Sequence, residues 1–194
     1  MKSIGYQLIV LAAGASTRFG SPKQLTRVNG VPLLQLMLSR ATAVAGHAVT
    51  VVLGANASDV VPALGRLPVS LVINRDWNEG LASSIRAGVR SLPGSCGGAL
   101  LLLADQASIT SADLQRLADS WARNPRAIVA AQYAGGHGVP ALFPRSEFPA
   151  LLRLQGEQGA RALLRNPAVS VIGVPMPSAA IDIDRPEDLA AIAP

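Results

Sequence analysis

The sequence predicts a three-layer α/β fold, in which helices cover both faces of a mainly parallel sheet. Apolar runs of strand length alternate with segments of helical period along the chain of 194 residues. The runs lack the alternation of apolar and polar residues that is typical of strands with one solvent-exposed face, so we expect them to be buried on both faces. No internal repeat, low-complexity tract or linker interrupts the pattern, which predicts one domain over residues 1–194.

The first predicted strand covers residues 4–12, a run that is almost entirely apolar. Further runs of this kind are expected to form strands at residues 49–53, 69–73, 99–103, 128–131 and 169–174. Two short clusters of glycine and proline, at residues 93–98 and 135–140, are predicted to be loops. The second cluster could instead be a hairpin or a flap over a site.

Between the runs, the apolar spacing predicts helices at residues 31–44, 81–92, 111–121 and 145–154. In the first helix Leu34 and Leu38 share one face, and Pro32 suits a first turn. Thr110 and Asp113 have the spacing of a capping pair at the start of the third helix. A last helix is expected to begin near Pro186.

The composition indicates which classes of protein to exclude. Hydrophobic residues make up 49% of the chain, yet no apolar run approaches the roughly 18 residues that span a bilayer, so no membrane partner is expected. The basic, then apolar start imitates a secretory signal, but it leads directly into the motif described next. Cys96 has no second cysteine to pair with, and we expect a cytoplasmic protein.

The net charge of +5 favours an anionic partner. The arginines are scattered and aromatic residues make up only 4% of the chain. A nucleic-acid-binding face would need clustered basic charge with aromatic side chains for stacking, so no nucleic-acid partner is expected. A phosphorylated small molecule fits better.

A loop with the sequence LAAGASTRFGSPKQL, residues 11–25, follows the first predicted strand. Ligands of such sheets bind beyond the carboxyl ends of the strands. Gly14 allows a sharp turn that brings N–H groups against a phosphate, Ser16 adds a hydroxyl donor, and Arg18 and Lys23 neutralise charge. The loop predicts a phosphate cradle, although it matches neither the P-loop nor the G-x-G-x-x-G fingerprint. An ordinary glycine turn is the alternative.

Asp105 is a candidate ligand for a divalent cation. It follows the apolar strand at residues 99–103, so we expect it at the carboxyl edge of the sheet. Mg²⁺ needs only one or two protein carboxylates because it keeps several waters. A helix N-cap is the alternative role, but Thr110 lies closer to the next helix.

The loop at residues 11–25 resembles the signature L-A-A-G-x-S-x-R-M-G-x-x-K-x-L of the MobA-like nucleotidyltransferases, most closely the molybdenum cofactor cytidylyltransferase branch. Four later segments are similar to segments of that family in the same order: NEGLASSIRAGV (78–89), LADQ (103–106), QGEQGARALL (155–164) and DIDRPEDL (182–189). The resemblance implies a Rossmann-like sheet of the nucleotide-diphospho-sugar transferase type.

The resemblance also implies roles for single residues. Arg18, Lys23 and Asp105 are expected to be catalytic, and Asp105 and Asp182 to hold Mg²⁺, with Asp182 narrowly preferred over Asp184. Gln106 and Arg161 are expected on the acceptor side. The nucleotide-binding residues that it implies are Ala12, Ala13, Gly14, Ser16, Lys23, Gly80, Ser83 and Ser84.

The activity that the resemblance implies is transfer of CMP from CTP to the phosphate of a molybdopterin-type cofactor, with release of pyrophosphate. A client molybdoenzyme that receives the product is a further partner that it implies. Ala13 favours CTP, since the guanylyl branch tends to carry glycine there. The alternatives are another acceptor, such as a sugar or polyol phosphate, and a cofactor carrier without catalysis. Three positions depart from the family pattern: Phe19 replaces methionine, Ala107 replaces proline in a loop that it should loosen, and Glu157 replaces aspartate.

Overall fold

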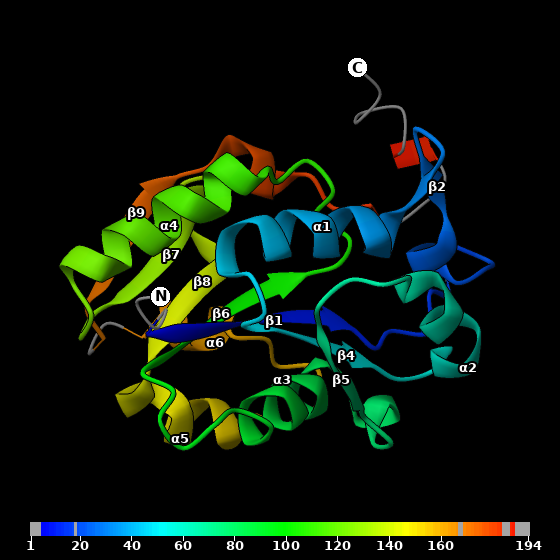
Figure 1. Cartoon of the computed structure of the whole chain (residues 1–194). Helices are drawn as coiled ribbons and strands as arrows, with labels where there is room; N and C mark the ends of the chain where they lie inside the picture. The colour runs from blue at the N-terminus through cyan, green and yellow to red at the C-terminus, as the bar shows by residue number, and fades with distance from the viewer. Residues whose placement is uncertain (1–4, 18, 167–168, 184–186, 189–194) are drawn as a thin grey trace.

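The computed structural model describes residues 5–17, 19–166, 169–183 and 187–188 (Figure 1). A seven-stranded sheet with the order β5-β4-β1-β6-β8-β7-β9 forms its centre. The strands are β1 (Tyr6–Ala12), β4 (Val49–Leu53), β5 (Ser70–Ile73), β6 (Gly98–Leu103), β7 (Ile128–Tyr133), β8 (Gly136–Pro144) and β9 (Val171–Pro175). Only β8 runs antiparallel to its neighbours β6 and β7, so the predicted mainly parallel sheet is confirmed.

Helices cover both faces of this sheet. In Figure 1, α1 (Leu33–Ala45) and α4 (Ser111–Arg123) lie above it, and α3 (Leu81–Arg90) and α5 (Phe148–Leu152) lie below. Successive side chains of a strand point to opposite faces, and β1 follows this rule: Leu8 and Val10 pack with the upper helices, whereas Ile9 and Leu11 pack with the lower ones. The apolar run of β1 is therefore buried on both faces, as predicted.

Several short elements complete the fold. The helices α2 (Ala57–Val60) and α6 (Arg161–Leu164) are single turns, and β2 (Arg27–Val28) pairs with β3 (Val31–Pro32) in a small hairpin. The 3₁₀ turns are η1 (Lys23–Leu25), η2 (Val61–Leu64), η3 (Trp77–Glu79), η4 (Arg145–Glu147) and η5 (Pro177–Ala180). None of the described helices is long and apolar enough to cross a membrane.

Three predictions about these elements need correction, and one open alternative is decided. The helix expected at 31–44 begins at Leu33, because the two residues before it pair as β3. The helix expected at 145–154 is divided into η4 and α5, since Pro149 has no N–H to give to a helix begun at Arg145. Strands β5 and β9 are the two edges of the sheet and are not buried on both faces: Leu71 of β5 is 42% exposed, and no residue of β9 is fully buried. The cluster at 135–140, predicted to be a loop with a hairpin or a flap as alternatives, belongs to the β7–β8 hairpin.

The start of α4 is as predicted. The Thr110 hydroxyl accepts a hydrogen bond from the Asp113 N–H, and the Asp113 carboxylate accepts one from the Thr110 N–H, which completes a capping box. Asp105 is therefore not the N-cap of this helix. Burial raises the pKa of the Asp113 carboxyl, but hydrogen bonds from Thr110 and Ser178 and the charge of Arg116 together hold that pKa below its usual value.

Candidate active site

A cleft of about 440 Å³ opens at the carboxyl ends of β1 and β6. This is where a parallel sheet places its ligands, because the loops that follow adjacent strands meet there. Four segments far apart in the sequence form most of its walls: the loop after β1, the chain from η3 to the start of α3, the loop after β6 and the loop between α5 and α6. The polar and glycine residues among them are Gly14, Lys23, Gln24, Asn78, Gly80, Ser84, Asp105 and Glu157.

The loop after β1 is held in shape by Gln24, whose side chain is buried. Its amide nitrogen donates to the carbonyl oxygens of Ala12 and Gly14, at 2.9 and 3.0 Å. The Ser16 hydroxyl donates to the Gln24 amide oxygen at 3.3 Å and accepts the Lys23 N–H at 3.2 Å. Ser16 thus fixes the loop from within, and Ala12, Ala13 and Gly14 line the cleft. Gln24 is not among the predicted site residues, although its position directly after Lys23 in the same loop could have indicated a role there.

Lys23 and Asp105 meet across the cleft. The Lys23 ammonium lies 2.5 Å from Asp105 Oδ2 and also donates to the Ile183 carbonyl at 3.2 Å. Within the described part of the chain, the other carboxylate oxygen, Oδ1, is buried and has no hydrogen-bond partner. A buried carboxylate oxygen without a donor or a cation is costly. The site is therefore suited to a further positive group.

Asp182 is brought to the same edge of the sheet by a backbone contact. The Ile183 N–H donates to the Asp105 carbonyl oxygen at 3.0 Å, so Asp182 and Asp105 lie on backbone segments that are directly hydrogen-bonded to each other. No cluster of three or more His, Cys, Asp or Glu occurs among the residues described. Two carboxylates suit Mg²⁺, which prefers hard oxygen ligands and keeps much of its water. Arg18, which is expected to be catalytic, and Asp184, the alternative to Asp182, lie outside the described residues.

Asn74 organises the start of α3. Its amide, which is buried, donates to the hydroxyls of Ser83 and Ser84 at 2.8 and 3.1 Å. Ser83 donates in turn to the Gly80 carbonyl at 2.8 Å and is not among the residues that line the cleft, whereas Ser84 is. Of the two predicted hydroxyl residues, only Ser84 therefore lines the cleft. Nothing in the local pattern marked Asn74, which lies between β5 and η3.

Position 80 requires glycine for two reasons, its backbone conformation and its close contact with Gly156. Its φ is +113°, and an added Cβ would lie 2.6 Å from the backbone carbon and oxygen of Gly156. We expect Gly80→Ala to lower the free energy of unfolding by about 2–4 kcal/mol, from backbone strain and the clash together. Urea denaturation measures this effect. The control Gly94→Ala, where a Cβ meets nothing within 4 Å, should change little, and equal stability of the two variants would contradict the prediction.

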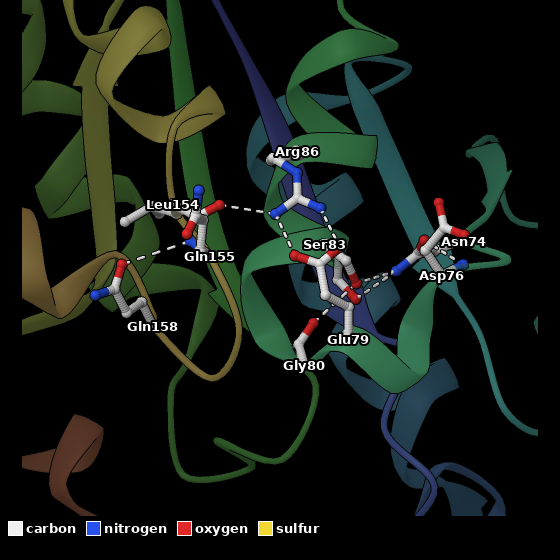
Figure 2. A network of polar contacts seen from close by, with 10 residues as sticks. Asn74, Asp76, Glu79, Gly80, Ser83, Arg86, Leu154, Gln155 and Gln158 are labelled. Carbon is white, nitrogen blue, oxygen red and sulfur yellow. Dashed lines mark hydrogen bonds and ion pairs between the residues drawn. The ribbon is translucent and has the colours of Figure 1, made fainter.

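Arg86 anchors the loop that faces the start of α3 (Figure 2). Its guanidinium donates to both carboxylate oxygens of Glu79, at 2.9 and 2.5 Å, and to the Leu154 carbonyl at 2.7 Å. The hydrogen bond from Arg86 is the largest cause that lowers the pKa of Glu79. The Ala82 N–H also donates to the Gly156 carbonyl at 3.1 Å. These contacts hold the loop that brings Glu157 into the cleft.

Arg40 of α1 supports the loop that carries Asp105. Its guanidinium donates to the carbonyl oxygens of Ala107 and Ile109, at 2.5 and 2.8 Å. Burial lowers the pKa of Arg40, and the charge of Asp113 partly opposes this shift. The expected loosening at Ala107, where the family has proline, is therefore opposed by a side chain that lies 67 residues away in the sequence.

We expect Arg40→Met to lower the free energy of unfolding by about 1–3 kcal/mol, because two carbonyls of the loop lose their donor. Affinity for Mn²⁺, used as a probe for the cation, should fall about tenfold if the loop carrying Asp105 shifts. Thermal unfolding and Mn²⁺ titration measure the two effects. Arg123→Met, at an exposed position of α4, is the matched control. Unchanged Mn²⁺ affinity in Arg40→Met would show that Arg40 does not position Asp105.

A second pocket of about 180 Å³ adjoins the cleft and shares Leu11, Leu81 and Leu103 with it. The predicted acceptor residues Gln106 and Arg161 both line it, together with Asp182. The Arg161 guanidinium lies over the ring of Tyr133, 5.9 Å from its centre. Burial raises the pKa of Tyr133, and the opposite charges of Arg161 and Asp182 act on it in opposite directions.

Comparison with known proteins adds to this geometry. A nicotine blue oxidoreductase of Paenarthrobacter nicotinovorans is 30% identical over 192 residues, which cover 93% of each chain. A probable molybdenum cofactor guanylyltransferase of Nostoc sp. is 28% identical, over 95% of this chain and 88% of the relative. The crystal structure of Rv0371c from Mycobacterium tuberculosis H37Rv in complex with manganese matches with a TM-score of 0.81 and 28% identity, over 96% of this chain and 97% of that one.

The sequence profile of the MobA-like NTP transferase domain matches residues 8–171. This range begins in β1 and ends at the first residue of β9, so it contains Lys23, Asp105 and the start of α3. The residues around the cleft thus fall within the matched domain. The chain belongs to the family of MobA-like NTP transferases, which are nucleotidyltransferases.

Proposed function

We propose that this protein is a Mg²⁺-dependent nucleotidyltransferase that transfers CMP from CTP to the phosphate of a molybdopterin-type cofactor. The reaction forms a bond between the acceptor phosphate and the α-phosphorus, and it breaks the bond from that phosphorus to pyrophosphate. Family membership supports the nucleotidyl transfer, and the name of the Nostoc relative supports the acceptor. A cytoplasmic location and delivery to a client molybdoenzyme belong to the same proposal.

The position of Asp105 carries this proposal. Asp105 lines the larger cleft, and the next residue, Gln106, lines the adjoining pocket. A nucleotide in the cleft and an acceptor in the pocket would therefore meet beside the Asp105 carboxylate. Its Oδ1 atom, buried and without a partner among the described residues, fits a divalent cation at that meeting point.

The chain's own residues would bind and orient the reactants. The backbone around Gly14 offers N–H groups to the triphosphate, and Lys23 neutralises part of its charge. Bound Mg²⁺, held by Asp105 and Asp182, would supply further neutralisation of charge on the triphosphate. The acceptor's own phosphate is the attacking group, so the reaction needs no nucleophile from the protein.

The choice of CTP rests on Ala13. This residue is buried, lines the cleft and stands where the guanylyl branch tends to carry glycine. A methyl group in place of a hydrogen at this position would leave less room for a base bound against this wall, and this would favour the smaller pyrimidine.

Pyrophosphate release tests the proposal directly. The protein is incubated with Mg²⁺, purified molybdenum cofactor and either CTP, GTP, ATP or UTP, and a sugar phosphate replaces the cofactor in parallel reactions. We expect release with CTP and the cofactor. Release only with the sugar phosphate would identify another acceptor. Cofactor binding without release from any nucleotide would identify a carrier, and would contradict the proposal.

A further inference from the structure

A buried amide oxygen in the second pocket has no partner among the residues that the structure describes. Gln106 is 1% exposed, and its Nε2 donates to the carbonyl oxygens of Val139 and Ala179, at 3.0 and 3.2 Å. Both hydrogens of the amide are thereby used, which fixes the side chain's orientation. The remaining atom, Oε1, accepts no hydrogen bond from any residue in the described ranges.

The walls of this pocket are mainly aliphatic. Leu81, Ile85 and Leu101 contribute to them, and charged groups enter only through Arg161 and Asp182 among the described residues. A sugar or polyol carries hydroxyls around its whole circumference, and most of them would be buried here without partners. A flat heteroaromatic ring presents its polar atoms only at its edge, so it could place apolar faces against the walls.

We propose that the second pocket takes a flat heteroaromatic ring with an N–H donor at its edge, and that Gln106 Oε1 accepts the hydrogen bond from that donor. This inference rests on the proposed function, because it treats the pocket as the site of the acceptor. It adds which group of the acceptor is recognised, the N–H donor at the edge of its ring, and which protein atom recognises it, Gln106 Oε1. A site built to accept a hydrogen bond discriminates strongly against a ligand that lacks the donor, since its own polar atom is then left unpaired.

Two ligands that differ only in donors test this inference. The first is 6-hydroxymethylpterin phosphate, and the second is the same compound methylated at N3 and at both positions of the 2-amino group. Binding to the whole protein is measured by calorimetry without any nucleotide. We expect the methylated compound to bind at least about tenfold more weakly. Glucose 1-phosphate, which carries a phosphate but no flat ring, should bind more weakly than the pterin.

Gln106→Met assigns the effect to one atom. Methionine fills a similar volume, but its thioether sulfur is only a weak hydrogen-bond acceptor, so the two pterins should bind this variant about equally. Thermal unfolding shows whether the variant is folded. If the variant does not fold, the comparison of ligands on the unchanged protein still tests the inference. Equal binding of both pterins to the unchanged protein, or stronger binding of glucose 1-phosphate, would overturn the inference.

The inference and the proposed function can fail separately. Pyrophosphate release from CTP with the cofactor, combined with equal binding of the two pterins, would retain the enzyme and reject the role of Gln106. The expected pterin discrimination without pyrophosphate release would retain the pocket and reject the nucleotidyl transfer.

Discussion

Asp105→Asn should reduce pyrophosphate release by about 10²–10³-fold, an effect typical of removing a principal electrostatic group from an active site. The substitution preserves the shape of the side chain but removes the charge that faces Lys23 at 2.5 Å. It also removes one of the two carboxylates proposed to hold Mg²⁺. The rate is measured with CTP and the cofactor at saturating Mg²⁺, and Mn²⁺ affinity is measured on the same preparation.

Stability distinguishes a functional role of Asp105 from a structural one. The carboxylate has one oxygen paired with Lys23 and one buried oxygen without a partner in the described residues, so its favourable and unfavourable contributions largely offset each other. We expect the free energy of unfolding of Asp105→Asn to stay within about 1 kcal/mol of the original. Asp59→Asn, on the surface helix α2, is the control. A large loss of stability would mean that the lost activity reports on folding.

The parts of the fold that the sequence predicts are those with a local cause. The apolar run of β1 continues without polar alternation because both of its faces are covered. Strand β8 was missed because its first residues include glycines and a proline, which are typical of loops. It is long because it pairs on both sides, with β6 and with β7, and no local pattern contains that information.

The same distinction applies to the site. Gly14, Lys23 and Asp105 stand at strand ends or in a glycine loop, which is a local signal, and all three line the cleft. Arg40 and Asn74 were missed because their roles depend on partners brought close by the fold. The proximity of Asp182 to Asp105 likewise depends on one backbone hydrogen bond from Ile183.

Lys23→Met should reduce pyrophosphate release by about 10²–10³-fold as well, because the triphosphate loses a cation. Unlike Asp105→Asn, it should also destabilise the protein, by about 1–3 kcal/mol. The reason is that the Asp105 carboxylate, whose Oδ1 is already without a partner in the described residues, loses its counter-ion, and the Ile183 carbonyl loses its donor. In Asp105→Asn, by contrast, the amide oxygen can still accept a hydrogen bond from Lys23. The difference between the two variants in the free energy of unfolding therefore shows whether Asp105 needs Lys23 for stability more than Lys23 needs Asp105. Thermal unfolding and the pyrophosphate assay measure the two effects.

Added Mn²⁺ or Mg²⁺ should restore part of the stability of Lys23→Met, since a cation that binds only the folded protein stabilises it by mass action. The same addition should stabilise the original protein less, because there Lys23 already neutralises Asp105. Lys23→Arg, which keeps the charge, should show little of this extra dependence on the cation. If Lys23→Met and the original protein gain equal stability from the cation, then Lys23 does not compete with the cation for the charge of Asp105.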